Sequence, residues 1–364
     1  MAAATALGRG PDAQLAATLA GTAAFGPVTR FDVSRQRVRV AATLPDAGSL
    51  ADELADATAT ACADGGLSRT ERAACPLLLA VHAFPDAPRV SVDGWPTAAD
   101  LARSLAARVG LGPVTRVYTS ACVSASTAVA DAAALISTGK AERVMVAAGY
   151  LVEPDQFALF DAGRALATDG AVRPFSIART GLLLGDAVAA VLLESVAALH
   201  RRARTELAQL VGWGRAGDAF HAVQPHPDGL GMARAITAAL DRAGVPGGAL
   251  GYINAHGTGT PVSDAAEAAA LHRALGPVAS LVPISSTKAT HGHALEASGL
   301  IELIVTVLAV RAGKLPVNAG FLALDQALRL NVVHSAPRSV GSDHALSVNA
   351  AFGGANTALV VRAV

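Results

Sequence analysis

We predict an α/β fold in which helices cover a largely parallel sheet, built from two duplicated βα halves. Strand-like runs such as RVMVAAG (143–149) alternate with helix-like runs, which is the pattern of layered α/β proteins. The helix-like runs STAVADAAALISTG (126–139) and GMARAITAALDRAG (231–244) each end in a glycine, which commonly closes a helix. The segments 185–196 and 354–364 both run from glycine through small residues into a β-branched strand, so a duplicated unit is the simplest account.

The length and charge of the chain limit the classes of protein to which it can belong. With 364 residues, it suits one large α/β domain or two halves that share a core, and we place these halves at residues 1–200 and 201–364. Its 29 basic and 29 acidic residues give no net charge that would draw nucleic acid or an anionic membrane to the surface. We therefore expect no nucleic-acid partner.

The sequence also bears on where the protein works. Residues 1–21 lack the basic region and the unbroken apolar run of a signal peptide. The most apolar tract, GLIELIVTVLAV (299–310), contains Glu302 and is too short to span a bilayer, so we expect a buried helix and no membrane insertion. Three widely spaced cysteines form neither a disulfide framework nor a paired zinc motif. These features predict a cytoplasmic protein.

Cys122 is the first candidate functional residue. It lies between a predicted strand at 114–120 and a predicted helix at 124–136. At a helix N-terminus, unpaired backbone N–H groups and the helix dipole favour thiolate over thiol. The small neighbouring residues would let a substrate approach. The alternative is a small buried hydrophobic side chain, the common role of a free cysteine and the one we expect for Cys62 and Cys75.

A second candidate site follows the predicted strand at 252–254. A glycine-rich turn there carries His256, Thr258 and Thr260, and a helix is expected to begin near Asp264. A histidine and two hydroxyls on a glycine-rich loop can hold a polar, flexible ligand. In the structural alternative, the aspartate caps the helix and the threonines form the turn. Both interpretations can hold together.

A third candidate site is the stretch STKATHGHALEASG (286–299). It sets Lys288 and two histidines, His291 and His293, before a small-residue tract that we expect to be helical. The spacing of the histidines would put both on one face of a strand, where they could share a zinc ion. No obvious third ligand is nearby in the sequence, so we expect no metal.

Taken together, these segments resemble the elongating β-ketoacyl synthases of the thiolase superfamily. Five blocks match the family in order and at similar spacing, namely TSACVSAS (119–126), the run 164–189, NAHGTGTPVSDAAEA (254–268), STKATHGHALEASG (286–299) and NAAFGGANTA (349–358). The resemblance extends from about residue 114 to residue 364. It implies a thiolase-like layered α-β-α-β-α fold, with the nucleophilic cysteine in the first half and both catalytic histidines in the second.

The resemblance implies a catalytic trio of Cys122, His256 and His293. The family pattern places the working histidine five residues after Lys288, which selects His293 and leaves His291 in a variable position. The cysteine would take an acyl chain from the phosphopantetheine arm of an acyl carrier protein. A malonyl-type thioester would then lose CO2, with its enolate oxygen bound by the two histidines. This is a decarboxylative Claisen condensation that needs no bound cofactor.

Further residues match supporting positions of the family. The backbone N–H groups of Cys122 and Phe352 would hold the oxyanion of the acyl-enzyme, and the Phe352 ring would gate the acyl channel. Thr258 and Thr260 would contact phosphopantetheine. A buried pair, Lys288 with Glu302, would support the site electrostatically.

The chain also departs from the family pattern. Ala350 replaces an aromatic residue and Ala351 a glycine, so the gate loop is less bulky. The segment 81–110 is shorter than its family counterpart. In the family, this region helps to build the acyl pocket and the dimer contact. Acyl chain length therefore stays open, and so does the choice between polyketide or polyene assembly and fatty-acid synthesis.

We expect a dimer, formed with a second copy or with a homologous ketosynthase or chain-length-factor subunit.

Two other functions stay open. The chain could be a non-catalytic partner of the chain-length-factor kind, or an acyltransferase that uses Cys122 without condensation. Retention of the thiol argues against the first, and the presence of both His256 and His293 argues against the second.

Overall fold

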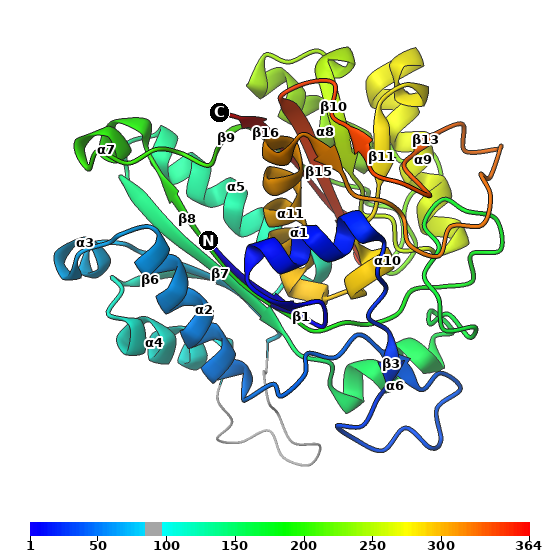
Figure 1. The fold of residues 1–364 in the computed structure, drawn as a ribbon, viewed down its shortest axis with the longest axis horizontal. Coiled ribbons are helices and arrows are strands. Elements are labelled where there is room, and N and C mark those ends of the chain that lie inside the picture. Colours follow the sequence, from blue (N-terminus) through cyan, green and yellow to red (C-terminus); the bar gives the residue numbers. More distant parts are fainter. Residues whose placement is uncertain (84–96) are drawn as a thin grey trace.

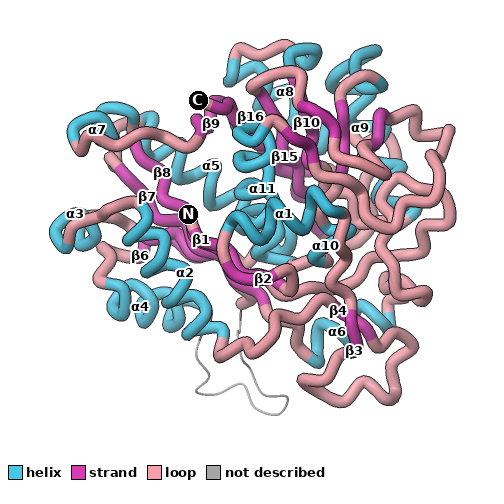
Figure 2. The backbone as a smooth tube through the Cα atoms, in the orientation of Figure 1, coloured by secondary structure: helices cyan, strands magenta, loops and turns pink. Residues whose placement is uncertain are grey.

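The computed structural model describes residues 1–83 and 97–364 and contains two six-stranded sheets (Figures 1 and 2). The first sheet has the spatial order β2 (Gly8–Arg9), β1 (Ala2–Thr5), β8 (Ala187–Glu194), β7 (Arg143–Tyr150), β5 (Leu77–Ala80) and β6 (Val114–Tyr118). The second has the order β13 (Asn331–Val332), β11 (Pro283–Ser285), β10 (Leu250–Asn254), β15 (His344–Ala351), β16 (Ala355–Ala363) and β9 (Ala208–Gly217). Two short ribbons pair β3 (Gly26–Pro27) with β4 (Val40–Ala41), and β12 (Lys314–Leu315) with β14 (Arg338–Ser339).

The expectation of one largely parallel sheet is wrong, because both sheets are mixed. In the first sheet, β5 runs parallel to β6 and β7, whereas β8 runs antiparallel to β7 and β1. In the second, β10 runs parallel to β11 and β15, whereas β16 runs antiparallel to β15 and β9. The tight turn between Ala351 and Ala355 explains the antiparallel β15–β16 pair, since a parallel pair needs a long crossover. The division at residue 200 stays a proposal.

The helices complete five layers. They are α1 (Pro11–Ala20), α2 (Leu50–Asp64), α3 (Arg69–Ala73), α4 (Ala98–Val109), α5 (Ser124–Ser137), α6 (Pro154–Ala162), α7 (Val196–Arg201), α8 (Leu230–Ala243), α9 (Pro261–Leu275), α10 (Lys288–His291) and α11 (Ser298–Ala312). Helices α5 and α11 contact both sheets and lie between them, α2 and α4 cover the outer face of the first sheet, and α8 covers that of the second, with α9 packed on α8 (Figure 1). The layered α-β-α-β-α fold is therefore confirmed.

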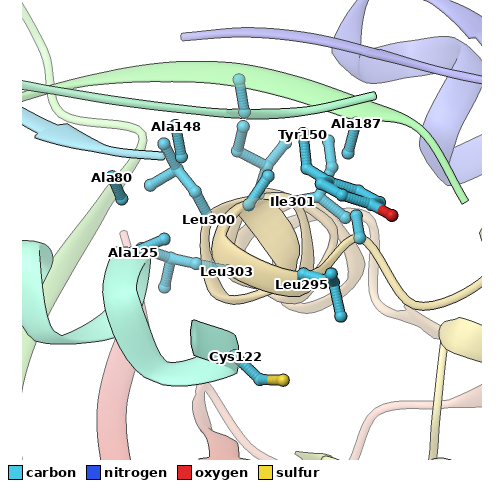
Figure 3. Close-up of a cluster of buried hydrophobic side chains, with 14 of the residues drawn as sticks. Ala80, Cys122, Ala125, Ala148, Tyr150, Ala187, Leu295, Leu300, Ile301 and Leu303 are labelled. Atoms are coloured by element: carbon cyan, nitrogen blue, oxygen red, sulfur yellow. The ribbon is translucent and has the colours of Figure 1, made fainter. Parts of the chain in front are cut away.

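Helix α11 forms the centre of the molecule. Its apolar residues surround the helix almost completely, which is typical of a helix buried on all sides. Leu300, Ile301 and Leu303 pack among small residues such as Ala125 and Ala148, which allow the neighbouring elements a close approach (Figure 3). The expected buried helix is thus confirmed. Within residues 1–83 and 97–364, no helix combines the length and apolar character needed to cross a membrane.

Candidate active site

Cys122 lies where the sequence predicted, between a strand and a helix. Strand β6 ends at Tyr118, a 3₁₀ turn, η1, spans Ala121–Val123, and α5 begins at Ser124. Ala121 has a φ of 51°, a left-handed conformation that is costly for a residue other than glycine. This turn sets the buried Cys122 side chain at the start of α5, in the layer between the two sheets.

The electrostatic setting of Cys122 differs from the expected one. Burial and, after it, the negative charge of Glu296 raise the pKa of the Cys122 thiol to about 12. The positive charge of Lys288 and the backbone of the turn oppose this shift but do not overcome it. The expectation of a stabilised thiolate is therefore wrong for the unacylated protein, because loss of hydration outweighs the favourable helix terminus.

His293 lies beside the thiol. Its Nε2 is 3.0 Å from Cys122 Sγ, and its Nδ1 is 2.9 Å from Ser298 Oγ. The Ser298 hydroxyl also accepts a hydrogen bond from the Ala294 backbone N–H at 3.0 Å. The backbone of His293 pairs with a neighbouring segment of the same chain, because its N–H donates to the carbonyl of Leu183 at 2.7 Å. The imidazole is thus held from both its ring and its backbone.

Residue Gly185 allows this close approach of two chain segments. Its N–H donates to the carbonyl of His293 at 3.1 Å, and a Cβ added to it would lie only 1.9 Å from the carbonyl oxygen of His291. Any larger residue would push the histidine loop away. The sequence run 164–189, which resembled a family block, therefore positions His293 through backbone contacts.

His256 completes a group of three with Cys122 and His293. The two imidazole rings meet edge to face with their centroids 5.5 Å apart. Burial, followed by the charge of Lys288, lowers the pKa of both imidazoles well below the usual value. Both rings are therefore neutral at physiological pH, and each can present one N–H as a hydrogen-bond donor.

A buried carboxylate holds the loop that carries His256. Glu267 of α9 accepts hydrogen bonds from the backbone N–H groups of His256 at 2.8 Å and Gly257 at 2.7 Å. The Nδ1 atom of His256 has no hydrogen-bond partner among the described residues. The position of this histidine is therefore fixed through its backbone rather than through its ring.

The two threonines lie on the same loop. Thr258 Oγ1 and Thr260 Oγ1 are 3.0 Å apart, and Thr258 is buried whereas Thr260 is partly exposed. Helix α9 begins at Pro261, three residues before Asp264, with Thr260 in the capping position, so the alternative that Asp264 caps the helix is wrong. The aspartate instead lies in the first turn and accepts from the N–H groups of Phe175 at 2.8 Å and Gly259 at 3.1 Å.

Lys288 and Glu302 form the expected buried pair. Lys288 Nζ lies 2.5 Å from Glu302 Oε1, and the other carboxylate oxygen accepts from Asn349 Nδ2 at 2.6 Å. Burial raises the pKa of Glu302, and the charge of Lys288 opposes that shift. Because Lys288 also lowers the pKa of both His256 and His293, it favours their neutral forms.

The strand assumed for a zinc site at His291 and His293 is absent, since residues Lys288–His291 form the short helix α10. His291 Nε2 lies 3.0 Å from Thr287 Oγ1, whereas His293 turns toward Cys122. Burial lowers the pKa of His291 to about 3. Across the part of the chain that the structure describes, no group of three histidine, cysteine or acidic residues could hold a metal ion.

Phe352 lies at the surface, in the turn between β15 and β16. Its residue is 49% exposed, and its ring stacks on Phe160 with centroids 5.8 Å apart. Gly353 and Gly354 follow with φ values of 82° and 76°, which glycine adopts without strain. Ala350 is buried and Ala351 is partly exposed before the turn.

The shortened segment 81–110 is described only in part, because residues 84–96 lie outside the described residues.

Sequence reasoning missed several side chains that hold the site. Ser298 orients the ring of His293. Asn349 binds the carboxylate of Glu302. Glu267 holds the backbone of the loop that carries His256. The signal for Ser298 was a polar residue within the small, apolar tract after His293. The contacts of the other two join distant elements, and no local pattern indicates them.

Comparison with known proteins agrees with this geometry. The family models for "Beta-ketoacyl synthase, N-terminal domain" and "Beta-ketoacyl synthase, C-terminal domain" match residues 36–198 and 207–322. The solved structure of a β-ketoacyl synthase from Burkholderia phymatum superposes with a TM-score of 0.90 at 27% identity, covering 100% of this chain and 98% of that one.

Two curated relatives are similar over part of their length. The chain is 40% identical over 256 residues to the tetracenomycin polyketide synthase ketoacyl synthase alpha subunit of Streptomyces glaucescens, covering 69% of this chain and 60% of that protein. It is 33% identical over 248 residues to a 3-oxoacyl-acyl-carrier-protein synthase 2 of Staphylococcus aureus, covering 66% and 61%. The matched region thus spans less than two thirds of either relative. From the family models and the fold together, the chain belongs to the β-ketoacyl synthase family.

Proposed function

We propose that this protein condenses a carrier-bound acyl chain with a malonyl-type thioester through an acyl-enzyme on Cys122. The observation that carries the proposal is the 3.0 Å contact between Cys122 Sγ and His293 Nε2, with the His256 ring against His293. These residues provide a nucleophile, a proton acceptor and two N–H donors within one buried site.

The first step is acylation. As the Cys122 sulfur attacks the acyl thioester, its proton passes to His293 Nε2, because burial disfavours a preformed thiolate. The bond from the acyl carbon to the carrier sulfur breaks, and the carrier thiol leaves with that proton. The backbone N–H groups of Cys122 and Phe352 are the proposed donors to the tetrahedral oxyanion.

The second step is condensation. The malonyl-type thioester loses CO2, and the electrons of the broken C–C bond form an enolate whose oxygen accepts hydrogen bonds from His256 and His293. The enolate carbon attacks the carbonyl of acyl-Cys122, a new C–C bond forms, and the cysteine sulfur leaves and takes up one proton from the solvent. Neutral imidazoles suit this role because each donates an N–H without adding charge to the site.

Ser298 can serve His293 in both steps. Its hydroxyl can accept a hydrogen bond from Nδ1–H, which leaves Nε2 free to take the thiol proton. It can also donate to Nδ1, which leaves the hydrogen on Nε2 for the enolate oxygen. A hydroxyl that reverses its role therefore supports a base in the first step and a donor in the second.

The proposed partners follow from the substrates. The phosphopantetheine arm of an acyl carrier protein would contact the hydroxyls of Thr258 and Thr260, which lie on the loop of His256. Lys288 and Glu302 would support the site without contacting the reacting atoms. We infer that the protein works as a dimer with itself or with a homologous ketosynthase or chain-length-factor subunit, in polyketide or fatty-acid biosynthesis. A cytoplasmic location fits its three free cysteines.

Intact-protein mass spectrometry tests the proposal. After incubation with acyl-carrier and malonyl-carrier protein, the parent should gain an acyl adduct and then release a product two carbons longer. Cys122→Ala should gain no adduct, whereas the controls Cys62→Ala and Cys75→Ala should be acylated like the parent. Both control thiols are buried in another apolar cluster, Cys62 on α2 and Cys75 shortly before β5. An adduct without elongation would indicate a simple acyltransferase, and no adduct would indicate a non-catalytic partner subunit.

A further inference from the structure

Glu296 is a buried carboxylate beside Cys122 that the proposed condensation does not use. It lies in the 3₁₀ turn η4 (Leu295–Ala297), which follows His293 and packs against η1, the turn that carries Cys122. Figure 3 shows Leu295 and Cys122 on the same side of helix α11. The Glu296 residue is only 4% exposed, and its charge is the strongest one that raises the pKa of Cys122. A negative charge at this place opposes formation of a thiolate, so it has no evident benefit for acylation.

The two oxygens of this carboxylate have different surroundings. Glu296 Oε1 lies 3.3 Å from Nδ1 of His82, which follows strand β5 and whose side chain is 40% exposed. Glu296 Oε2 is buried and has no hydrogen-bond partner within residues 1–83 and 97–364. A buried carboxylate oxygen without a donor is costly, so such an oxygen commonly indicates a missing partner.

The backbone also holds Glu296 in place at a cost. Leu295 has a φ of 40° and Ala121 a φ of 51°, so a left-handed residue directly precedes both Glu296 and Cys122. Strained backbone of this kind persists where the surrounding structure requires a side chain to point in one direction. The two turns therefore hold the carboxylate and the nucleophile in neighbouring, defined positions.

We propose that Glu296, positioned by His82, accepts a hydrogen bond from a hydroxyl group on the acyl chain carried by Cys122. The proposal rests on the proposed function and specifies its substrate class, namely hydroxylated acyl chains rather than saturated ones. A hydrocarbon chain would leave Oε2 buried and unpaired, whereas a hydroxyl donates the missing hydrogen bond.

The charges of His82 and Glu296 favour a hydroxyl over an ammonium group as the hydrogen-bond donor on the substrate. The hydrogen bond and the charge of Glu296 raise the pKa of His82, which favours the imidazolium form. An imidazolium beside the carboxylate balances its charge, so the buried site does not need a second cation from the substrate. A neutral hydrogen-bond donor therefore fits the site best.

Competing thioesters test this inference. We would measure kcat/KM for acylation of Cys122 by the N-acetylcysteamine thioesters of octanoate and of 3-, 5- and 7-hydroxyoctanoate. At least one hydroxyoctanoyl thioester should react about tenfold or more faster than octanoyl thioester, since an unpaired buried oxygen costs that much or more. Glu296→Met, which removes the acceptor at similar length, should abolish this preference. The control Glu53→Gln changes a buried carboxylate bound to Arg9, far from the site in the fold, and should retain it.

The outcomes separate this inference from the proposed function. Equal or faster acylation by octanoyl thioester in the parent would overturn the inference and leave the condensing function standing. Hydroxyl preference that persists in folded Glu296→Met protein would also overturn it. If none of the four thioesters acylates Cys122, the proposed function fails, and the inference fails with it. The comparison of thioesters in the parent needs no variant, so it holds even if Glu296→Met does not fold.

Discussion

His293 Nε2 lies 3.0 Å from Cys122 Sγ, although the two residues are 171 positions apart in the chain. The thiol is carried by the turn before α5 and the imidazole by the loop between α10 and α11, so two elements of the central region bring them together. Burial raises the pKa of the thiol and lowers that of the imidazole. Both shifts favour the pair of neutral groups over a thiolate with an imidazolium.

The first prediction concerns the reactivity of Cys122 with iodoacetamide. Because the folded protein raises the thiol pKa to about 12, the thiolate fraction should increase about tenfold for each pH unit between pH 6.5 and 9. We expect the alkylation rate to rise throughout this range. The measurement follows adduct formation by mass spectrometry, with Cys122→Ala protein used to subtract reaction at Cys62 and Cys75. A rate that is already constant above pH 6.5 would indicate a preformed thiolate–imidazolium pair.

The second prediction separates the two histidines. His293 contacts the thiol, so His293→Ala should slow acylation of Cys122 by about 10²–10⁴, the usual contribution of a general base. His256→Ala should leave acylation close to that of the parent. Each variant should reduce malonyl decarboxylation by about 10²–10³, the usual loss for one oxyanion donor. Acylation and CO2 release are measured separately, and equal acylation rates in the two variants would contradict the proposed proton acceptor.

The local features of the site could be predicted from the sequence. A strand-like run, a group of small residues and a helical run placed Cys122 at a turn, and the structure has this order. The apolar run 299–310 likewise predicted a buried helix, because a helix that is hydrophobic on all sides can only lie in the interior. Both inferences depend on residues that are close together in the chain.

The features that depend on distant contacts could not be predicted in this way. The periodicity of hydrophobic residues identifies strands but not which strands pair or in which direction. For this reason, one parallel sheet was expected where the structure has two mixed sheets. The turn at Cys122 suggested a thiolate, but the opposing charge of Glu296 and the loss of hydration arise only when the central layer assembles. The pairing of Cys122 with His293 was available only from the family resemblance. The catalytic roles of both stay predictions.

The third prediction concerns Ser298 as a positioning residue. Ser298→Ala removes the hydrogen bond to His293 Nδ1 and should lower kcat about tenfold while KM for the acyl substrate stays unchanged. The matched control is Ser126→Ala, which removes a buried hydroxyl of α5 that donates to the Val123 carbonyl in the turn directly before that helix. A merely structural role for Ser298 would lower the unfolding temperature of both variants similarly and leave kcat unchanged in the folded fraction.

The last prediction concerns the coupling between Lys288 and Glu302. Both side chains are buried and lie 2.5 Å apart, so Lys288→Met should lower the free energy of unfolding by about 3–5 kcal/mol, because it leaves an uncompensated carboxylate in the interior. Glu302→Gln should be similarly destabilising, because it leaves the buried ammonium group of Lys288 without a compensating charge. The double variant keeps an amide beside Asn349 and buries no charge, so it should be more stable than Lys288→Met alone. Urea unfolding at fixed protein concentration measures all four proteins, and destabilisations that simply add would show that the two charges are not coupled.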